Sequence, residues 1–443
     1  MKKPLLVLIT GALMLLFLTT SCTMKKKPQE KAVIHFPITT EYEVKETNLQ
    51  SIKDNLDPRE KLLMDIVEHF NSIQDEVEVK TDFITVTSGG WPGSELDLDS
   101  YKNKEGTPFD IYRFNSYAAF DFDDVLNKNP GILLDMSSMY NSSAHATIAQ
   151  TILQGGMHDD KLLMIPATIN FNTMTYNKQI FDELNIPYPD SDWTWEQFSE
   201  IASHIRASGS YRGSFLPFEP IDLIRLILNI SGNDIFASDG STAIGYLDSE
   251  AAIKAIRWFR FYLVANPQST RYEDWTESDS TAFEEGKMGI ASHYSRNESN
   301  KLKTGTVPMP RVAGQPNTIP VYMTGMGISS QSLQPQAAWK FIEYLLLSVN
   351  KDSLNYAYGL LPASEPLAQE MGKTEEDMTN LYGFVANGAC RVKPYWLERV
   401  WNNQLKAQLD EIMSADDSEV PDLMHKLAEA VDKELKRQQS SQQ

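Results

Sequence analysis

Hydrophobic and polar residues follow one another with two periods along the chain, one typical of strands and one typical of helices. Residues 32–37 (AVIHFP) form a short, mostly apolar run that predicts a first strand. Apolar residues in 62–70 then recur at helical spacing, so we expect a helix there. Asp57 and Pro58 predict its start, with Asp57 as the cap and Glu60 as the return partner of a capping box.

The same alternation of element types continues beyond this helix. Val77 and Val79 alternate with charged residues, which predicts a half-buried strand. Thr194 and Gln197 have the spacing of a capping box in front of a second amphipathic helix. A third apolar stripe at helical spacing comprises Ala338, Phe341, Ile342 and Leu345. Alternating strands and helices predict a fold of α/β layers.

The N-terminus has the composition of an export signal. Lys2 and Lys3 are followed by a 14-residue apolar run, Leu5 to Leu18, and then by small and hydroxylated residues. This run is too short to span a bilayer comfortably, so residues 1–21 are interpreted as a signal peptide that is removed.

Cys22 directly follows this segment, an arrangement that resembles the bacterial lipobox. The usual pattern is Leu-x-small-Cys; Ser21 fits it, and Thr19 departs from it. We expect Cys22 to be the lipidated mature N-terminus, palmitate being one such lipid, with residues 22–30 as a polar tether. The alternative is an ordinary signal peptide with a coincidental cysteine.

Composition limits the classes of function. With 443 residues and 42% hydrophobic content, the chain can form two or three packed domains. Its 40 basic and 60 acidic residues give a formal charge of -20, the wrong sign for binding nucleic acid. The two cysteines, Cys22 and Cys390, lie too far apart in sequence for a CxxC metal site or a disulfide framework.

Motifs for catalysis are absent from the sequence. The seven histidines form no HExxH pair, and no GxSxG or GxxxxGK[ST] motif occurs. Gly325 and Gly327 lack the third glycine of a dinucleotide loop and are expected to pack closely in a strand. The acidic stretch with Glu95, Asp97 and Asp99 lacks the EF-hand glycine, which favours a solvated loop. We therefore expect no enzyme activity, cofactor or metal, although paired carboxylates of a glycosidase remain open among 60 acidic residues.

A series of short motifs occurs in an order that is similar to one known family. The chain resembles the extracellular solute-binding proteins of family 1, the sugar-binding lipoprotein components of bacterial ABC importers. The motifs that carry this resemblance are KLLMIP (161–166), MTYNKQIF (174–181), WTWEQF (193–198), FEEGKMGI (283–290), VPMP (307–310) and LPA (361–363).

The resemblance implies a periplasmic-binding-protein-like fold. Such proteins have two α/β lobes joined by a hinge that the chain crosses several times, with the ligand between the lobes. By position, lobe 1 comprises residues 31–168 and 322–375, and lobe 2 comprises residues 169–321 and 376–436. The hinge is expected near residues 168–170 and 320–322.

The resemblance also implies a function. We expect the protein to be a lipid-anchored monomer on the extracytoplasmic face of the cell membrane of a Gram-positive bacterium. It would capture a sugar, specifically an oligosaccharide, by lobe closure. It would then deliver this sugar to the permease subunits of an ABC transporter. Two alternatives stay open: an exported carbohydrate-active enzyme, and a receptor of the same architecture for a peptide, a polyamine or a metal chelate.

Sugar sites combine aromatic side chains, which stack on the ring faces, with planar polar groups that bind the hydroxyls. The family places such residues in loops after strands and at the hinge. Carried over by position, the stacking candidates are Trp91, Phe114, Tyr294 and Trp396. The polar candidates are Asn115, Asn170, Asn172, Glu219 and Arg296. For each, a core or solvated surface role is the competing interpretation, whereas Trp193 and Trp195 are expected to be structural.

Overall fold

A computed structural model describes most of the chain in ordered segments. The described residues are 30–40, 49–85, 102, 106–115, 122, 125–126, 129–170, 172–216, 218, 220–230, 233–237, 240–265, 277–292, 302–314, 318–320, 322–358, 360–371, 389–391 and 400–441.

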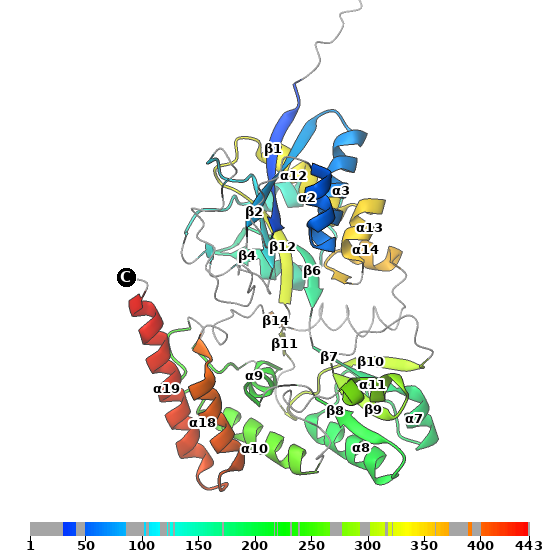
Figure 1. Cartoon of the computed structure of the whole chain (residues 1–443), viewed down its shortest axis with the longest axis vertical. Coiled ribbons are helices and arrows are strands. Elements are labelled where there is room, and N and C mark those ends of the chain that lie inside the picture. Colours follow the sequence, from blue (N-terminus) through cyan, green and yellow to red (C-terminus); the bar gives the residue numbers. More distant parts are fainter. Residues whose placement is uncertain are drawn as a thin grey trace, which may run out of the picture.

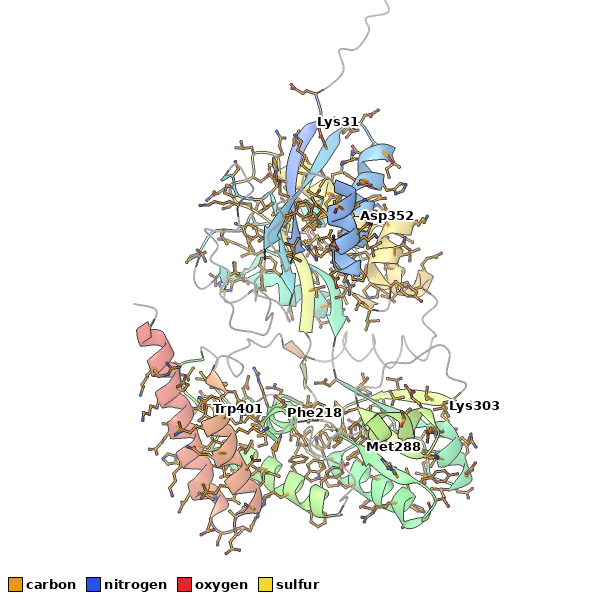
Figure 2. All side chains as sticks on the ribbon, in the orientation of Figure 1. Lys31, Phe218, Met288, Lys303, Asp352 and Trp401 are labelled. Carbon is orange, nitrogen blue, oxygen red and sulfur yellow. The ribbon has the colours of Figure 1, made fainter. Side chains whose placement is uncertain are left out.

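The elements form two bodies, which Figure 1 shows one above the other. Figure 2 shows Lys31 and Asp352 in the upper body and Phe218, Met288 and Trp401 in the lower one. We call the upper body lobe 1 and the lower body lobe 2. Each contains its own cluster of buried hydrophobic side chains, so each has a separate core.

Lobe 1 is built from two stretches of sequence. Its strands are β1 (Ala32–Thr40), β2 (Val77–Thr85), β3 (Ile111–Asn115), β4 (Met157–His158), β5 (Lys161–Leu162), β6 (Ile165–Asn170), β12 (Tyr322–Ile328) and β13 (Leu361–Pro362). Its helices are α2 (Leu49–Asn55), α3 (Pro58–Ile73), α5 (Ser137–Ser142), α6 (Gln150–Leu153), α12 (Pro335–Ile342), α13 (Lys351–Ala357) and α14 (Glu365–Glu370). A 3₁₀ turn (Gln154–Gly156) and a π-helical segment (Glu343–Leu347) complete it.

Lobe 2 also combines two stretches. Its strands are β7 (Thr173–Asn177), β8 (Arg212–Phe215), β9 (Met288–Ser292) and β10 (Thr304–Pro308). Its helices are α7 (Lys178–Glu183), α8 (Trp195–Ala207), α9 (Pro220–Ile230), α10 (Glu250–Ala265), α11 (Glu277–Glu284), α18 (Asn403–Ser414) and α19 (Val420–Ser441). Two further strands, β11 (Thr318–Pro320) and β14 (Ala389–Arg391), pair in parallel between the lobes.

The main sheet of lobe 1 has the order β13-β6-β12-β3, and all its neighbours are antiparallel. Beside it, β1 and β2 form a parallel pair in register from Ala32↔Val77 to Thr40↔Thr85. Asp110, just before β3, joins the two sheets, because its backbone N–H donates to the His35 carbonyl and its carboxylate accepts from the His35 N–H. The expected strands at 32–37 and at Val77 are confirmed, and both extend further than the sequence pattern predicts.

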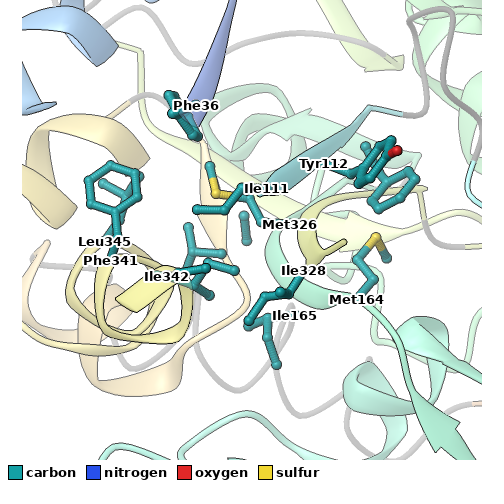
Figure 3. Close-up of a cluster of buried hydrophobic side chains, with 14 of the residues drawn as sticks. Phe36, Ile111, Tyr112, Met164, Ile165, Met326, Ile328, Phe341, Ile342 and Leu345 are labelled. Atoms are coloured by element: carbon teal, nitrogen blue, oxygen red, sulfur yellow. The ribbon is translucent and has the colours of Figure 1, made fainter. Parts of the chain in front are cut away.

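Side chains from helix and sheet meet in the core of lobe 1 (Figure 3). The rings of Phe36 in β1 and Phe341 in α12 pack edge to face, with centroids 5.3 Å apart. In β12, a Cβ on Gly325 would lie 2.5 Å from the Met164 side chain, and one on Gly327 would lie 2.6 Å from the Leu163 carbonyl oxygen. The two glycines therefore permit close backbone packing, as expected, and do not form a phosphate loop.

The sheet of lobe 2 has the order β10-β7-β9-β8, with β8 and β9 parallel and the other neighbours antiparallel. Trp193 and Trp195 are buried beside Phe198 of α8, and the Trp193 indole donates to the Pro308 carbonyl. Their expected structural role is confirmed. Asn177 is likewise buried, and its side chain caps α7.

Helix caps follow the sequence signals with one exception. Asp57 accepts from the Arg59 N–H at the start of α3, and Thr194 and Gln197 form the complete capping box of α8. The predicted return contact from Glu60 to the cap is wrong. The Glu60 carboxylate is buried and instead accepts hydrogen bonds from the Arg113 guanidinium and from the backbone N–H of Thr39.

Candidate functional site

Three strand ends meet at one edge of the lobe 1 sheet. β3 ends at Asn115, β6 ends at Asn170, and β12 begins at Tyr322. Thr324 of β12 pairs with Asn115 on one side and with Thr168 on the other. Because β12 is antiparallel to both neighbours, its start lies beside their carboxyl ends. The topology thus brings Asn115 and Asn170, which are 55 positions apart, to the same edge.

Hydroxyl groups fix the strands just inside this edge. The Oγ1 atoms of Thr168 and Thr324 lie 2.7 Å apart and share a hydrogen bond. Thr168 also pairs with Pro362 of β13, so the row crosses all four strands. This hydrogen bond joins β6 to β12 close to the strand ends at Asn115 and Asn170.

An ion pair between Arg113 of β3 and Glu60 of α3 also fixes the position of β3. The Arg113 guanidinium nitrogens Nη1 and Nη2 each donate to one Glu60 oxygen at 2.8 Å, and Nη1 also donates to the Pro37 carbonyl. Burial alone would raise the pKa of Glu60, but the Arg113 charge and the hydrogen bonds outweigh it and leave this pKa below its ordinary value. The pair connects α3, β1 and β3, and it therefore fixes the strand that ends at Asn115.

Lobe 2 has an equivalent edge. β8 ends at Phe215, and the parallel strand β9 ends at Ser292. β7 begins beside them, because Met174 pairs with Ser292 in antiparallel register. Each predicted polar residue of lobe 2, and one aromatic residue, lies within four positions of these strand ends in sequence: Asn172, Glu219, Tyr294 and Arg296.

Residues 171 and 172 connect the two edges, since β6 ends at Asn170 and β7 begins at Thr173. In Figure 1, the end of β6 and the start of β12 lie on the side of lobe 1 that faces lobe 2. The chain therefore passes from the lobe 1 edge to the lobe 2 edge within two residues. Amides and hydroxyls arranged in this way can bind a polar solute from two directions.

The structure describes four of the predicted ligand-binding residues, and the others lie outside the described part of the chain. Phe114 is 2% exposed, and its ring packs against Phe122, with centroids 5.2 Å apart, and against Tyr112. Stacking on a ligand would therefore require Phe114 to be uncovered. The backbone of Asn115 and Asn170 is placed at the lobe 1 edge, and Asn172 is partly buried beside β7. Trp91, Glu219, Tyr294, Arg296, Trp396 and Cys22 lie outside the described residues, and so does the Glu95–Asp99 loop.

Two polar residues that the sequence analysis did not select are buried in lobe 2. Ser292 is 4% exposed and Asn229 of α9 is 2% exposed. The Ser292 Oγ and the Asn229 Oδ1 are both enclosed without a hydrogen-bond partner. The sequence did contain a signal for Asn229, because it is one of three polar residues in the otherwise apolar α9.

A surface groove of about 570 Å³ lies elsewhere in lobe 1, between α5 and α12. It is lined by Ser138, His145, Trp339, Glu343 and neighbouring residues, and none of the predicted site residues contributes to it. Ser143 donates a hydrogen bond to Glu343 in its wall. Because its lining includes none of the predicted residues, we do not assign the ligand site to this groove.

In the part of the chain that the structure covers, no three His, Cys, Asp or Glu side chains are grouped as metal ligands. Within those same segments, no helix has both the length and the apolar composition needed to cross a bilayer.

Comparison with known proteins places this geometry in context. Residues 67–380 match the family model described as bacterial extracellular solute-binding protein. Curated binding proteins of Brucella abortus (strain 2308) and Brucella suis biovar 1 are 23% identical over 254 residues, which is 54% of this chain. The match spans about 60% of the length of these relatives.

Solved structures share the fold over almost the whole chain. A family 1 extracellular solute-binding protein from Alicyclobacillus acidocaldarius has a TM-score of 0.68 at 14% identity and covers 92% of this chain and 99% of its own. The cyclic alpha-maltosyl-1,6-maltose binding protein of Arthrobacter globiformis has a TM-score of 0.63 at 16% identity, covering 92% and 100%. A Listeria monocytogenes ABC substrate-binding protein in complex with cycloalternan has a TM-score of 0.59 at 16% identity, covering 91% and 99%.

Proposed function

Since the chain belongs to the bacterial extracellular solute-binding proteins, we propose that it captures a sugar, specifically an oligosaccharide, between its lobes and delivers it to the permease of an ABC importer. Family membership and the shared fold confirm the predicted resemblance and the two-lobed α/β architecture. The identity of the solute and the delivery step belong to the proposal.

One observation carries this proposal. The edges of two separately packed sheets are joined by residues 171 and 172, and six of the polar and aromatic candidates lie at these strand ends or within four positions of them in sequence: Asn115, Asn170, Asn172, Glu219, Tyr294 and Arg296. A solute held by loops of both lobes binds more tightly when the lobes are closed, so it shifts the population toward the closed state. The closed state is then the form that a permease recognises.

The proposed lobe boundaries are those expected from the sequence, residues 31–168 with 322–375 and residues 169–321 with 376–436. The β6–β7 connection and the β11–β14 pair support this division, because chain crosses between the two cores at these points. The proposed ligand contacts are Trp91, Phe114, Asn115, Asn170, Asn172, Glu219, Tyr294, Arg296 and Trp396.

The sugar class is supported by the titles of similar structures. Those proteins bind cyclic alpha-maltosyl-1,6-maltose, cycloalternan and maltose. Lipid anchoring through Cys22 on the extracytoplasmic membrane face, a monomeric state and the absence of enzymatic turnover are parts of the same proposal.

A thermal-shift panel of oligosaccharides, peptides, polyamines and metal ions tests the proposal. A ligand present at a thousandfold excess over its dissociation constant should stabilise the native state by about 4 kcal/mol, which raises the melting temperature by at least a few degrees. We expect an oligosaccharide to produce this shift and to be recovered unchanged. A shift with a peptide or polyamine alone, or conversion of the sugar, would contradict it.

A further inference from the structure

Helix α9 occupies a special position in lobe 2. It begins at Pro220, shortly after β8 ends at the edge from which the candidate loops leave. It packs against α10 inside lobe 2, and it also contacts β11, one of the strands between the lobes. Figure 1 shows α9 next to β11 on the side of lobe 2 that faces lobe 1. The helix therefore lies between the lobe 2 core and the interlobe connection.

The sequence of α9 divides it into two faces. Leu223, Ile224 and Ile227 lie on one side and belong to the buried core of lobe 2. Asp222, Arg225 and Asn229 fall on a single stripe at helical spacing, on the opposite side. Arg225 and Asn229 of this stripe are buried, and α9 as a whole contacts β11, the strand between the lobes.

Asn229 is the unexplained member of this stripe. It is only 2% exposed, and its Oδ1 has no hydrogen-bond partner. An enclosed amide oxygen without a partner destabilises the folded protein, whereas a leucine at the same position would avoid this cost. A buried polar group without a partner calls for an explanation, and a hydrogen bond to a bound ligand is one that can be tested.

The Arg225 charge is paired within lobe 2. The Arg225 Nε lies 3.6 Å from the Asp234 Oδ1, and both side chains are largely buried. Asn229 therefore offers a neutral acceptor next to a compensated ion pair. Such an acceptor matches a hydroxyl donor and does not match a phosphate or a carboxylate.

Ser292 provides a second, independent observation. It ends β9 at the edge of the lobe 2 sheet, and its enclosed Oγ also has no partner. The two unpartnered polar atoms thus occur on β9 and on the helix that follows its neighbour β8. We propose that Asn229 is part of the ligand site and that its Oδ1 accepts a hydrogen bond from a hydroxyl group of a bound neutral carbohydrate. This inference rests on the proposed function.

The experiment compares wild type with Asn229→Leu by calorimetric titration with maltose, acarbose, D-mannitol and D-tagatose, together with melting of the ligand-free protein. Asn229→Leu removes the acceptor and keeps the branched shape. We expect its affinity to fall at least about tenfold, since one hydrogen bond to the ligand is lost. The melting temperature of the ligand-free variant should stay equal or rise.

Gln408→Leu is the matched control. The Gln408 Oε1 in α18 is also enclosed without a partner, but α18 packs on α19, and the lobe edge lies elsewhere. This variant should leave affinity unchanged. Asn229→Ala serves as a second variant in case leucine does not fit, and it should show the same loss of affinity.

The outcomes separate the two proposals. If wild type binds a probe and both Asn229 variants bind it equally well, the role of Asn229 is overturned and the proposed function stands. If both variants melt several degrees lower with unchanged affinity in the folded fraction, Asn229 is structural and the inference is wrong. If wild type binds none of the carbohydrates, the proposed function fails, and the role of Asn229 fails with it.

Discussion

Arg113 and Glu60 form a bidentate ion pair, in which the guanidinium nitrogens Nη1 and Nη2 each lie 2.8 Å from one carboxylate oxygen. The residues are 53 positions apart, on β3 and α3. Asn115 follows Arg113 by two positions on the strand whose end forms one side of the candidate site. The position of that strand end therefore depends on the Arg113–Glu60 ion pair inside lobe 1.

Replacing Arg113 by methionine should destabilise the protein by about 3 kcal/mol, because it leaves the largely buried Glu60 carboxylate without its counter-charge. Urea unfolding of wild type and variant measures this loss. Lys340→Met is the control: it breaks the exposed ion pair with Glu76 and should change stability little. Equal effects of the two substitutions would show that burial does not strengthen the Arg113 pair.

Acid should weaken the same contact. The pKa of Glu60 lies below its ordinary value of 4.5. A group with a lowered pKa in the folded state contributes stability that is present above about pH 4.5 and is lost as the pH falls through the folded pKa. Glu60→Gln cannot titrate, so its unfolding free energy should fall less steeply in this range. Identical acid profiles for wild type and variant would contradict the prediction.

His425 should act in the opposite direction. Its Nδ1 lies 2.6 Å from the Asp248 Oδ2, and this hydrogen bond, with nearby Glu429 and Asp422, raises the pKa of His425 above 6.5. Its contribution is therefore complete below about pH 6.5 and is lost as the pH rises through the higher folded pKa. Melting curves between pH 5.5 and 9 should show a smaller pH dependence in His425→Gln.

Asp248→Asn tests the partner of His425. It should reduce the pH dependence of melting as much as His425→Gln does, and the double variant should add little to either. Additive effects would mean that the two residues act separately.

Membrane attachment depends on Cys22. Expressed in a bacterium that processes lipoproteins, the full-length protein should fractionate with membranes and carry lipid on Cys22, whereas Cys22→Ser should not. Mass spectrometry of the mature N-terminus gives the direct measurement. Equal membrane fractions for the two forms, or an unmodified Cys22, would rule out the anchor.

Trp91 and Trp396 should carry ligand affinity. If each stacks on a sugar ring, Trp396→Ala should weaken binding by roughly 2 kcal/mol, about thirtyfold, with a small effect on the ligand-free protein. A core tryptophan would instead lose about 3 to 5 kcal/mol of folding stability on truncation and leave affinity little changed. Calorimetric titration and melting of both alanine variants distinguish these roles.

Local signals predicted local structure well. Asp57 and Thr194 cap helices through contacts with residues two or three positions away, so a short stretch of sequence contains all the necessary information. The partner of Glu60 was mispredicted because it lies on β3, and only the packing of β1 against β3 brings it near. The capping motif was present, but burial of the carboxylate favoured the arginine.

The candidate site was predicted by family position, since its residues come from strand ends that are far apart in sequence. Asn115 and Asn170 lie at the same sheet edge only because β12 pairs with both β3 and β6. Phe114 had the chemistry of a stacking residue, but the sequence could not indicate that Phe122 covers its ring. Asn229 was missed because the apolar character of α9 dominates its pattern, and an unpartnered atom is visible only in three dimensions.

The two-residue connection between β6 and β7 also restricts how a solute can enter. Three Cα steps separate Asn170 from Thr173, so these two points can never be more than about 11 Å apart. The two lobes therefore cannot separate at this point, and any change in their relative orientation has to keep Asn170 and Thr173 close together. If a solute binds between the lobes, as proposed, it has to enter from a side that this connection does not hold together.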